Sequence, residues 1–250
     1  MTTATGTKPP GTSNEQEAAQ WVRRMFAGIA PRYDFANHLL SFNIDRQWRK
    51  ALVRHLAPIL QRPDATVLDL CCGTGDVLFD LQQAAATTCV LGADFCHPML
   101  LAAQHKAVQR RLAISLFEGD ALELPIRDRR VDAISVAFGF RNLSSYERGL
   151  SELHRALKPG GTLAILEFSQ PPGRLMRASY GIYSHLVLPV LGSLISRSPG
   201  AYAYLPASIA RFPRARELRS MMNQAGFVNT EFTLLTGGIA ALHTGLAASA

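Results

Sequence analysis

The chain has 250 residues, of which 48% are hydrophobic and 18% charged, a composition that excludes disorder and favours one large α/β domain over two small ones. Its formal net charge of +7 suggests an anionic partner, such as a nucleic acid, an anionic membrane surface or an acidic substrate. The net charge alone does not distinguish these partners from one another, and a net charge can also reflect solubility without any anionic partner.

The first part of the chain predicts a tail followed by two helices. Met1 to Gln20 is polar, rich in Thr, Gly and Pro, and lacks the apolar core of a signal peptide, so we expect a flexible tail. Apolar residues then recur at helical spacing and predict an amphipathic helix that ends before Pro31, namely Val22, Met25, Phe26 and Ile29. A second helical stretch runs from about Trp48 to Leu60.

From residue 66 onward, strand and helix patterns alternate, which predicts a doubly wound, mostly parallel sheet with helices on both faces. Gly160–Gly161 separates a predicted helix from the next strand as a helix cap would. Seven strands result, in a single α/β domain from residue 21 to 250. The predicted elements are Thr66–Leu70, Val77–Gln83, Cys89–Ala93, Pro98–Gln109, Ile114–Glu118, Val131–Phe138, Tyr146–Leu157, Thr162–Phe168, Arg214–Ala225, Asn229–Leu235 and Gly238–Gly245.

Residues 171–213 break this alternation and predict a helical insertion that covers the crevice. Its longest apolar stretch, Ile182 to Ile195, falls short of the roughly 20 residues that a spanning helix needs, so we expect no transmembrane segment. The part from Leu175 to Tyr204 has no acidic residue and carries three arginines in it or directly before it, Arg174, Arg177 and Arg197. Two interpretations are equally open, a contact with an anionic membrane and a buried lid over the active site.

Four cysteines, Cys71, Cys72, Cys89 and Cys96, have no spacing that suits a zinc site or a disulfide framework. We therefore expect a reducing, cytoplasmic setting, and no metal is implied.

A glycine-rich turn, Cys72-Gly73-Thr74-Gly75-Asp76, joins the strand at Thr66–Leu70 to the following helix. In doubly wound folds such a turn borders the crevice at the carboxyl ends of the strands, where glycine lets a ligand approach the backbone. A dinucleotide fingerprint would need a third glycine where this chain has Leu78. The turn is thus a candidate binding loop for a ligand other than a dinucleotide.

Two carboxylates flank the loop. Asp69 precedes it and Asp76 stands at the start of the helix, so a cationic ligand head suits the site better than a pyrophosphate does. S-adenosylmethionine carries an ammonium and a sulfonium and fits this requirement. Two alternatives remain: Asp76 only caps its helix, which we favour, and Asp69 only satisfies amides of the turn.

Two further strand ends carry acidic residues. Asp94 lies close to the roughly 20-residue distance beyond the loop expected for an acceptor of ribose hydroxyls. Asp120, in Gly119-Asp120-Ala121, ends a third strand where it could accept from an adenine amino group. Three such strand ends on one rim favour a nucleoside ligand.

These residues resemble class I methyltransferases and, among them, the UbiE/MenG quinone-biosynthesis C-methyltransferases. The resemblance runs from about Val22 to the C-terminus, and its glycine loop and Lys-Pro-Gly-Gly stretch are broadly shared. More specific are Arg32-Tyr33-Asp34 and Phe138-Gly139-Phe140-Arg141-Asn142. Asn43, Cys96 and Ala137 depart from residues found in the family, which bears on substrate selection more than on the reaction.

The resemblance implies C-methylation of a prenylated quinol, such as demethylmenaquinol, with S-adenosylmethionine as the methyl donor. It implies Asp69, Gly73, Thr74, Asp94, Asp120 and Ala121 for cofactor binding, and Arg141, Asn142 and Tyr33 for catalysis. Arg141 and Asn142 would hold the quinol oxyanion or a water acting as base, and Tyr33 would contribute from an N-terminal lid. Taken singly, Arg141 is better explained as a surface ion-pair partner, and Tyr33 as a core aromatic whose hydroxyl is satisfied.

Three rival functions remain: a methyltransferase for another lipophilic or phenolic molecule, a non-catalytic cofactor- or lipid-binding protein, and an RNA methyltransferase. The third is disfavoured because the chain lacks an appended RNA-binding module and a basic run with interleaved aromatics. We therefore expect a prenylated quinol and a transient anionic membrane surface as partners, and no nucleic acid.

Overall fold

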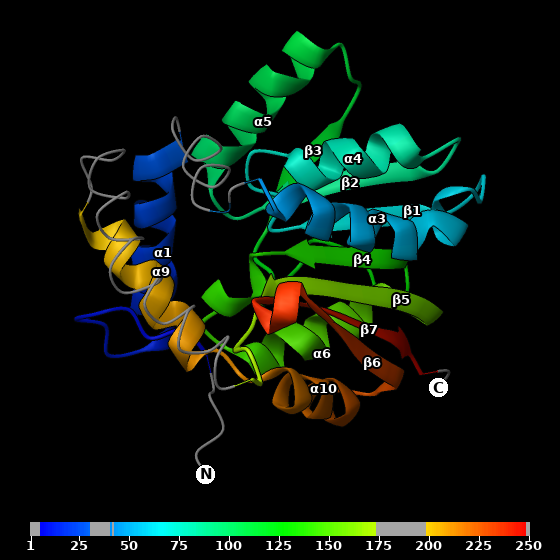
Figure 1. Cartoon of the computed structure of the whole chain (residues 1–250). Coiled ribbons are helices and arrows are strands. Elements are labelled where there is room, and N and C mark those ends of the chain that lie inside the picture. The colour runs from blue at the N-terminus through cyan, green and yellow to red at the C-terminus, as the bar shows by residue number, and fades with distance from the viewer. Residues whose placement is uncertain (1–5, 31–40, 42, 174–198, 249–250) are drawn as a thin grey trace.

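A computed structural model describes residues 6–30, 41, 43–173 and 199–248. Its centre is one seven-stranded sheet with the strand order β3-β2-β1-β4-β5-β7-β6 (Figure 1). The strands are β1 Thr66–Leu70, β2 Cys89–Asp94, β3 Ser115–Glu118, β4 Val131–Ala137, β5 Leu157–Phe168, β6 Phe227–Leu235 and β7 Ala240–Ala247. The pairs from β3 to β5 are parallel, whereas β7 is antiparallel to both β5 and β6. The predicted doubly wound, mostly parallel sheet is confirmed.

Helices cover both faces of the sheet (Figure 1). On one face lie α3 (Asp45–Leu60) and α4 (Asp76–Ala84), and on the other α6 (Tyr146–Ala156) and α10 (Ala215–Gln224). Helix α5 (His97–Arg110) packs beside the edge strand β3. Helices α1 (Glu15–Ile29) and α9 (Pro199–Arg211) pack together beyond the carboxyl ends of the parallel strands.

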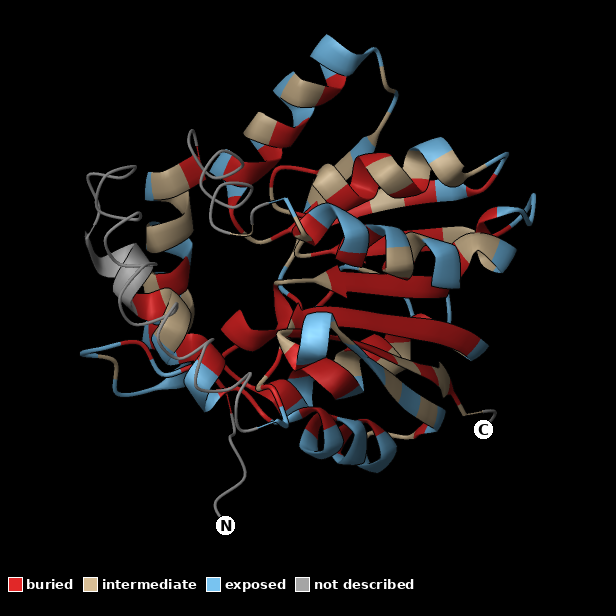
Figure 2. Ribbon diagram, viewed as in Figure 1, coloured by how far each residue is buried: buried red, intermediate tan, exposed pale blue. Residues whose placement is uncertain are grey.

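Two hydrophobic clusters, one on each face, hold these layers together. Leu52, Leu56 and Leu60 of α3 pack with Leu78 and Leu81 of α4, at the helical spacing that the sequence shows. The other cluster joins α6 and α10 to the far face and includes Leu150, Leu153, Leu218 and Met222. Because both faces are covered, β4 is buried almost throughout, as Figure 2 shows.

The N-terminal stretch differs from the prediction of a tail that extends to Gln20. Helix α1 begins at Glu15, where Asn14 caps it by accepting a hydrogen bond from the Glu17 amide. Thr7 is also buried, and its amide donates to the carbonyl of Leu143 at 2.8 Å. Side-chain capping by Asn14 thus starts the helix earlier than its apolar spacing indicated.

Strand β5 also begins earlier than predicted, at Leu157. Leu157 pairs with Val131, and the register resumes only where Thr162 pairs with Ala133, so the intervening residues bulge from the ladder. Gly160 has φ +74°, a left-handed conformation that favours glycine. The two glycines therefore mark an irregularity inside β5 and do not cap the preceding helix.

Most of the predicted insertion at 171–213 lies outside the described residues. Its described end contains α9, which is helical as expected. No helix in the described part of the chain combines the length and the apolar character that spanning a bilayer requires.

Candidate active site

The glycine loop turns the chain sharply from β1 into α4. Cys71, Gly73 and Gly75 have positive φ values of 55°, 54° and 88°. A Cβ on Gly75 would lie 2.8 Å from the ring of Phe79, so glycine is needed there for conformation and for space. The predicted strand-to-helix turn is confirmed, and its backbone faces the carboxyl edge of the sheet.

Asp94, the last residue of β2, holds this loop in place. One of its carboxylate oxygens accepts from the Gly73 amide at 2.9 Å and the other from the Cys96 amide at 2.8 Å. Burial raises the pKa of Asp94 to about 6, although these amide hydrogen bonds act in the opposite direction. Asp94 therefore links the glycine loop to the start of α5 and retains lone pairs for a further donor.

Asp69 lies deeper, within β1. Its Oδ1 accepts from the hydroxyl of Ser135 on β4 at 2.7 Å. Burial raises the pKa of Asp69 to about 7, and the nearby Asp94 carboxylate adds to this effect. Asp69 therefore links β1 to β4 directly before the glycine loop begins.

The role of Asp76 differs from both predictions, a helix cap and a negative charge that disfavours a pyrophosphate. Gly75 is the N-cap of α4, so the favoured interpretation of Asp76 as a capping residue is wrong. Its carboxylate instead lies 2.5 Å from Arg49 and 2.8 Å from Lys106. Burial alone would raise the pKa of Asp76, but these two cations outweigh it and lower the pKa to about 2. Asp76 is therefore anionic but neutralised, and it adds little to selection against phosphate.

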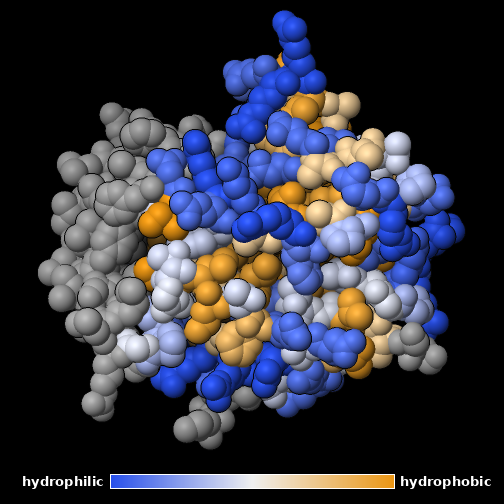
Figure 3. Space-filling view, turned by 45° about the vertical axis from the view of Figure 1, so that its right-hand side comes forward, coloured by the Kyte–Doolittle hydropathy of each residue, from blue (hydrophilic) through white to orange (hydrophobic). Residues whose placement is uncertain are grey.

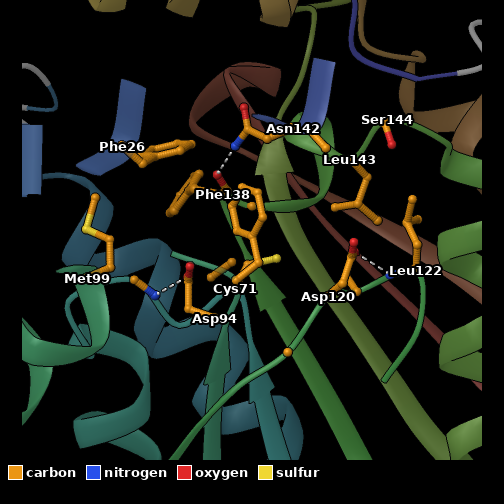
Figure 4. A pocket seen from close by; sticks show the side chains of 17 residues that line it. Phe26, Cys71, Asp94, Met99, Asp120, Leu122, Phe138, Asn142, Leu143 and Ser144 are labelled. Atoms are coloured by element: carbon orange, nitrogen blue, oxygen red, sulfur yellow. Dashed lines mark hydrogen bonds between the residues drawn. The ribbon is translucent and has the colours of Figure 1, made fainter. Parts of the chain in front are cut away.

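A pocket opens above the loop, and its empty space, including the part open to solvent, is about 700 Å³. Figure 4 shows Asp94 and Cys71 at its base, Phe26 and Met99 on one side, and Leu143 on the other. The described lining contains two carboxylates, Asp94 and Asp120, and no lysine or arginine. A cationic, partly apolar ligand fits this lining better than an anionic one does.

The structure brings five of the predicted site residues to this pocket, namely Gly73, Asp94, Asp120, Ala121 and Asn142. Asp69, Thr74 and Arg141 lie beside it and are not among the described lining residues. Thr74 is buried and accepts from Lys106 at 3.4 Å. Tyr33 lies outside the described residues, so its predicted role remains untested.

Arg141 is buried behind the pocket in the short helix η2 (Phe140–Asn142). Its guanidinium donates to Glu167 Oε1 at 2.9 Å and to the carbonyl of Phe138, while its amide donates to Glu167 Oε2 at 3.1 Å. The guanidinium also lies 5.3 Å from the ring centre of Phe168. Arg141 thus ties η2 to β5.

Sequence reasoning missed several apolar lining residues, contributed by α1, the start of α5 and the loop after β4. They are Ala19, Phe26, Phe95, Met99, Phe138 and Leu143. Phe26 shares the apolar stripe that predicted α1, and this stripe faces the pocket and not only the core. An apolar face on a helix beside a predicted crevice was the available signal.

S-adenosylmethionine fits this arrangement on three counts: the carboxylate-only charge of the lining, the presence of Gly73 of the glycine loop in the lining, and the apolar walls. Asp94 would accept from its ribose hydroxyls and Asp120, at the exposed rim, from its adenine amino group. The exposed Asp120 also accepts from the Leu122 amide at 2.9 Å, which fixes its carboxylate at the pocket edge (Figure 4).

Comparisons with known proteins agree with the geometry. Residues 12–247 match the model of the ubiE/COQ5 methyltransferase family. A demethylmenaquinone methyltransferase of Thermus thermophilus is 48% identical over 221 residues, which cover 88% of this chain and 99% of that protein. A ubiquinone/menaquinone biosynthesis C-methyltransferase UbiE of Syntrophotalea carbinolica is 42% identical, with 93% of this chain and 97% of that protein covered.

Solved structures share the fold at low identity. An S-adenosylmethionine-dependent methyltransferase of Aquifex aeolicus superposes with a TM-score of 0.55 at 20% identity, covering 75% of this chain and 84% of that one. A cyclase, SpnF, superposes with a TM-score of 0.67 at 14% identity, covering 98% and 100% of the two chains. Because a cyclase shares it, the fold does not by itself fix the reaction.

Proposed function

The chain belongs to the ubiE/COQ5 methyltransferase family, and we propose that it methylates a ring carbon of a prenylated quinol, demethylmenaquinol in the first instance. The enzyme is an S-adenosylmethionine-dependent methyltransferase. The observation that carries the substrate proposal is the pocket itself. It combines two carboxylates at the cofactor end with aromatic and aliphatic walls and the amide of Asn142.

The chemistry explains why the substrate is a quinol. The bound cofactor supplies an electrophilic methyl group on a sulfonium. A ring carbon attacks that methyl only when the ring is electron-rich, which a quinol becomes once a hydroxyl loses its proton. A new carbon–carbon bond then forms, the carbon–sulfur bond breaks, and the ring carbon afterwards loses its hydrogen as a proton. A quinone lacks the required nucleophilic carbon.

Asp94 and the glycine loop act before the chemistry, by fixing the position of the cofactor. Asp94 accepts from the Gly73 amide, so the same carboxylate that meets the ribose also sets the loop conformation. Asp120 and Ala121 line the same pocket, and we assign the adenine to their side of it. Such positioning of the donor against the acceptor is a large part of catalysis in group transfer.

Asn142 is a polar residue of the pocket lining, and we assign it to the substrate side. Its carboxamide lines the pocket together with the rings of Phe26 and Phe138, which suit an aromatic ring. Asn142 can donate to the developing oxyanion of the quinol. Arg141, clamped by Glu167, holds η2 and therefore Asn142 in place. Tyr33, outside the described residues, is proposed to contribute from the N-terminal side.

The prenyl tail of the substrate resides in lipid, so we include a transient contact with an anionic membrane surface, on the cytoplasmic side. The net charge of +7 supports this contact. The space-filling view adds hydrophobic residues grouped within a largely hydrophilic face (Figure 3). Within segment 175–204, the part up to residue 198 lies outside the described residues and remains the proposed point of contact, whereas Tyr204 is buried.

The test is methylation of reduced demethylmenaquinol with labelled cofactor, followed by identification of the labelled product. The proposal requires labelled menaquinol. Labelling of a different phenolic lipid in place of demethylmenaquinol would favour the first rival function, a methyltransferase for another lipophilic molecule. Ligand binding without release of S-adenosylhomocysteine would favour a binding protein.

A further inference from the structure

Three buried side chains from distant parts of the sequence form a hydrogen-bonded chain that ends at the pocket. Thr7 Oγ1 lies 2.7 Å from the hydroxyl of Tyr204. That hydroxyl in turn lies 3.1 Å from Asn142 Oδ1. Thr7, Tyr204 and Asn142 are 6%, 6% and 8% exposed, so water competes little for these bonds. Of the three, only Asn142 lines the pocket.

The direction of these hydrogen bonds follows from the groups at the two ends. Asn142 Nδ2 donates to the carbonyl oxygen of Phe138 at 3.4 Å, the hydrogen bond drawn as a dashed line beside Asn142 in Figure 4. A carbonyl only accepts, so the nitrogen of the amide must face Phe138 and its oxygen must face Tyr204. The single proton of Tyr204 is therefore donated to Asn142, and Thr7 must donate to Tyr204.

Tyr204 is suited to remain a donor. Burial raises its pKa, so the hydroxyl keeps its proton throughout the pH range in which an enzyme of this kind works. The ring is held as well, because its centre lies 5.1 Å from that of Trp21 on α1. The donor is thus fixed in both protonation and position.

The other end of the chain is equally constrained. The Thr7 amide donates to the carbonyl of Leu143, the residue after Asn142, at 2.8 Å. A Cβ on Gly6 would lie 1.9 Å from the Ser144 carbonyl oxygen, so only glycine fits at this approach. The N-terminal segment is therefore packed directly against the loop that carries Asn142.

We propose that Tyr204, backed by Thr7, is a positioning residue that holds the Asn142 amide with one N–H directed toward the substrate oxyanion. Tyr204 occupies the amide oxygen and Phe138 takes one N–H, so the second N–H is presented to an oxygen of the ring being methylated. Without Tyr204 the amide can turn and present its oxygen, which repels an oxyanion. This inference rests on the proposed function, because the oxyanion belongs to the quinol.

A double-mutant cycle tests this inference on the full-length protein with reduced demethylmenaquinol. Tyr204→Phe should lower kcat about tenfold or more, while the cofactor Kd stays unchanged. Asn142→Ala should lower kcat at least as much. The decisive variant combines both, and its kcat should equal that of Asn142→Ala alone, because Tyr204 acts only through Asn142. Losses that multiply in the double variant would overturn the proposal, as would an unchanged kcat in Tyr204→Phe.

Matched variants separate positioning from folding. Ser208→Ala removes another α9 hydroxyl, which donates to the Leu205 carbonyl at 2.8 Å, and should leave kcat unchanged. Thr7→Val should lower kcat and Thr7→Ser should restore it, since serine keeps the donor. Equal activity of these two variants would contradict the role of Thr7.

A readout without turnover distinguishes failure of this inference from failure of the proposed function. If the wild-type enzyme methylates no quinol, the function fails. The side-chain amide resonance of Asn142 still reports on its hydrogen bond, and it should shift in Tyr204→Phe and not in Ser208→Ala. An unshifted resonance in Tyr204→Phe would overturn the positioning proposal whatever the substrate.

Discussion

Replacing Asp94 by alanine should weaken cofactor binding and destabilise the fold by separable amounts. The change removes the acceptor of two backbone amides, Gly73 and Cys96. Each buried amide left without a partner costs about 1–3 kcal/mol, so the loss of stability should reach about 2–6 kcal/mol. Burial disfavours the ionised Asp94 carboxylate, as its raised pKa shows, so removing the carboxylate recovers part of this loss of stability. We therefore expect a loss of stability near the lower end of that range.

For the cofactor, the lost interaction is a charge-assisted hydrogen bond to the ribose, worth about 1.5–3 kcal/mol, and the Kd should rise about tenfold to a hundredfold. Titration calorimetry measures the Kd, and urea denaturation measures the stability. Because the pKa of Asp94 is about 6, wild-type affinity should also fall as the pH drops below that value. The variant Asp94→Asn should lose the part of this pH dependence that Asp94 contributes.

Asp132 provides the control, since it is 5% exposed where Asp94 is 6% and likewise accepts from a backbone amide, that of Thr66. Asp132 is the second residue of β4, so it lies near the amino ends of the parallel strands, whereas Asp94 lies at their carboxyl ends. Asp132→Ala should therefore lower stability and leave the Kd unchanged. An unchanged Kd in Asp94→Ala, or an equal rise in both variants, would refute the assignment of Asp94 to the ribose.

Three further outcomes are expected. The pKa of Asp69 is raised to about 7 from an unfolded value near 3.8, so its contribution to stability is fully present below about pH 4 and is lost as the pH rises to 7. Asp69→Asn should therefore raise stability by about 1–4 kcal/mol at about pH 8, measured by urea denaturation without ligand, and give no gain near pH 4. Gly75→Ala should cost at least about 1 kcal/mol in the same assay, because residue 75 has φ +88° and its Cβ would meet Phe79; a neutral effect would contradict the assigned loop strain. Arg141→Lys keeps the charge but loses the rigid guanidinium whose Nη1 donates to both Glu167 and Phe138, so kcat should fall about tenfold with cofactor affinity preserved, and near-normal kcat would show that charge alone suffices.

The sheet was predictable from the sequence because its strands are short apolar runs separated by helical patterns and turns. Thr66–Leu70 is confirmed at both ends, and the other six predicted strands are confirmed as elements with shifted bounds. The exceptions come from local chemistry that hydrophobic periodicity does not record. They are the Asn14 cap that starts α1 early and the bulge that carries β5 across Gly160.

The cofactor side of the site was also predictable, because acidic residues at consecutive strand ends must meet on one rim of a parallel sheet. Asp94 and Asp120 lie there as expected. The environment of Asp76 was not predictable, since Arg49 and Lys106 come from two other helices. The hydrogen bonds from Thr7 to Tyr204 and from Tyr204 to Asn142 join residues 197 and 62 positions apart, and no local sequence pattern predicts such contacts.

The most direct test of the central claim compares the two redox forms of one substrate. Purified enzyme is incubated with methyl-labelled cofactor and demethylmenaquinone, with and without a reductant that converts the quinone to the quinol, and the label on the ring is quantified. Reduced substrate should yield ring-methylated product together with an equal amount of S-adenosylhomocysteine, and the oxidised form should yield neither. Equal labelling of the oxidised quinone under strictly non-reducing conditions would contradict the proposed nucleophilic ring carbon.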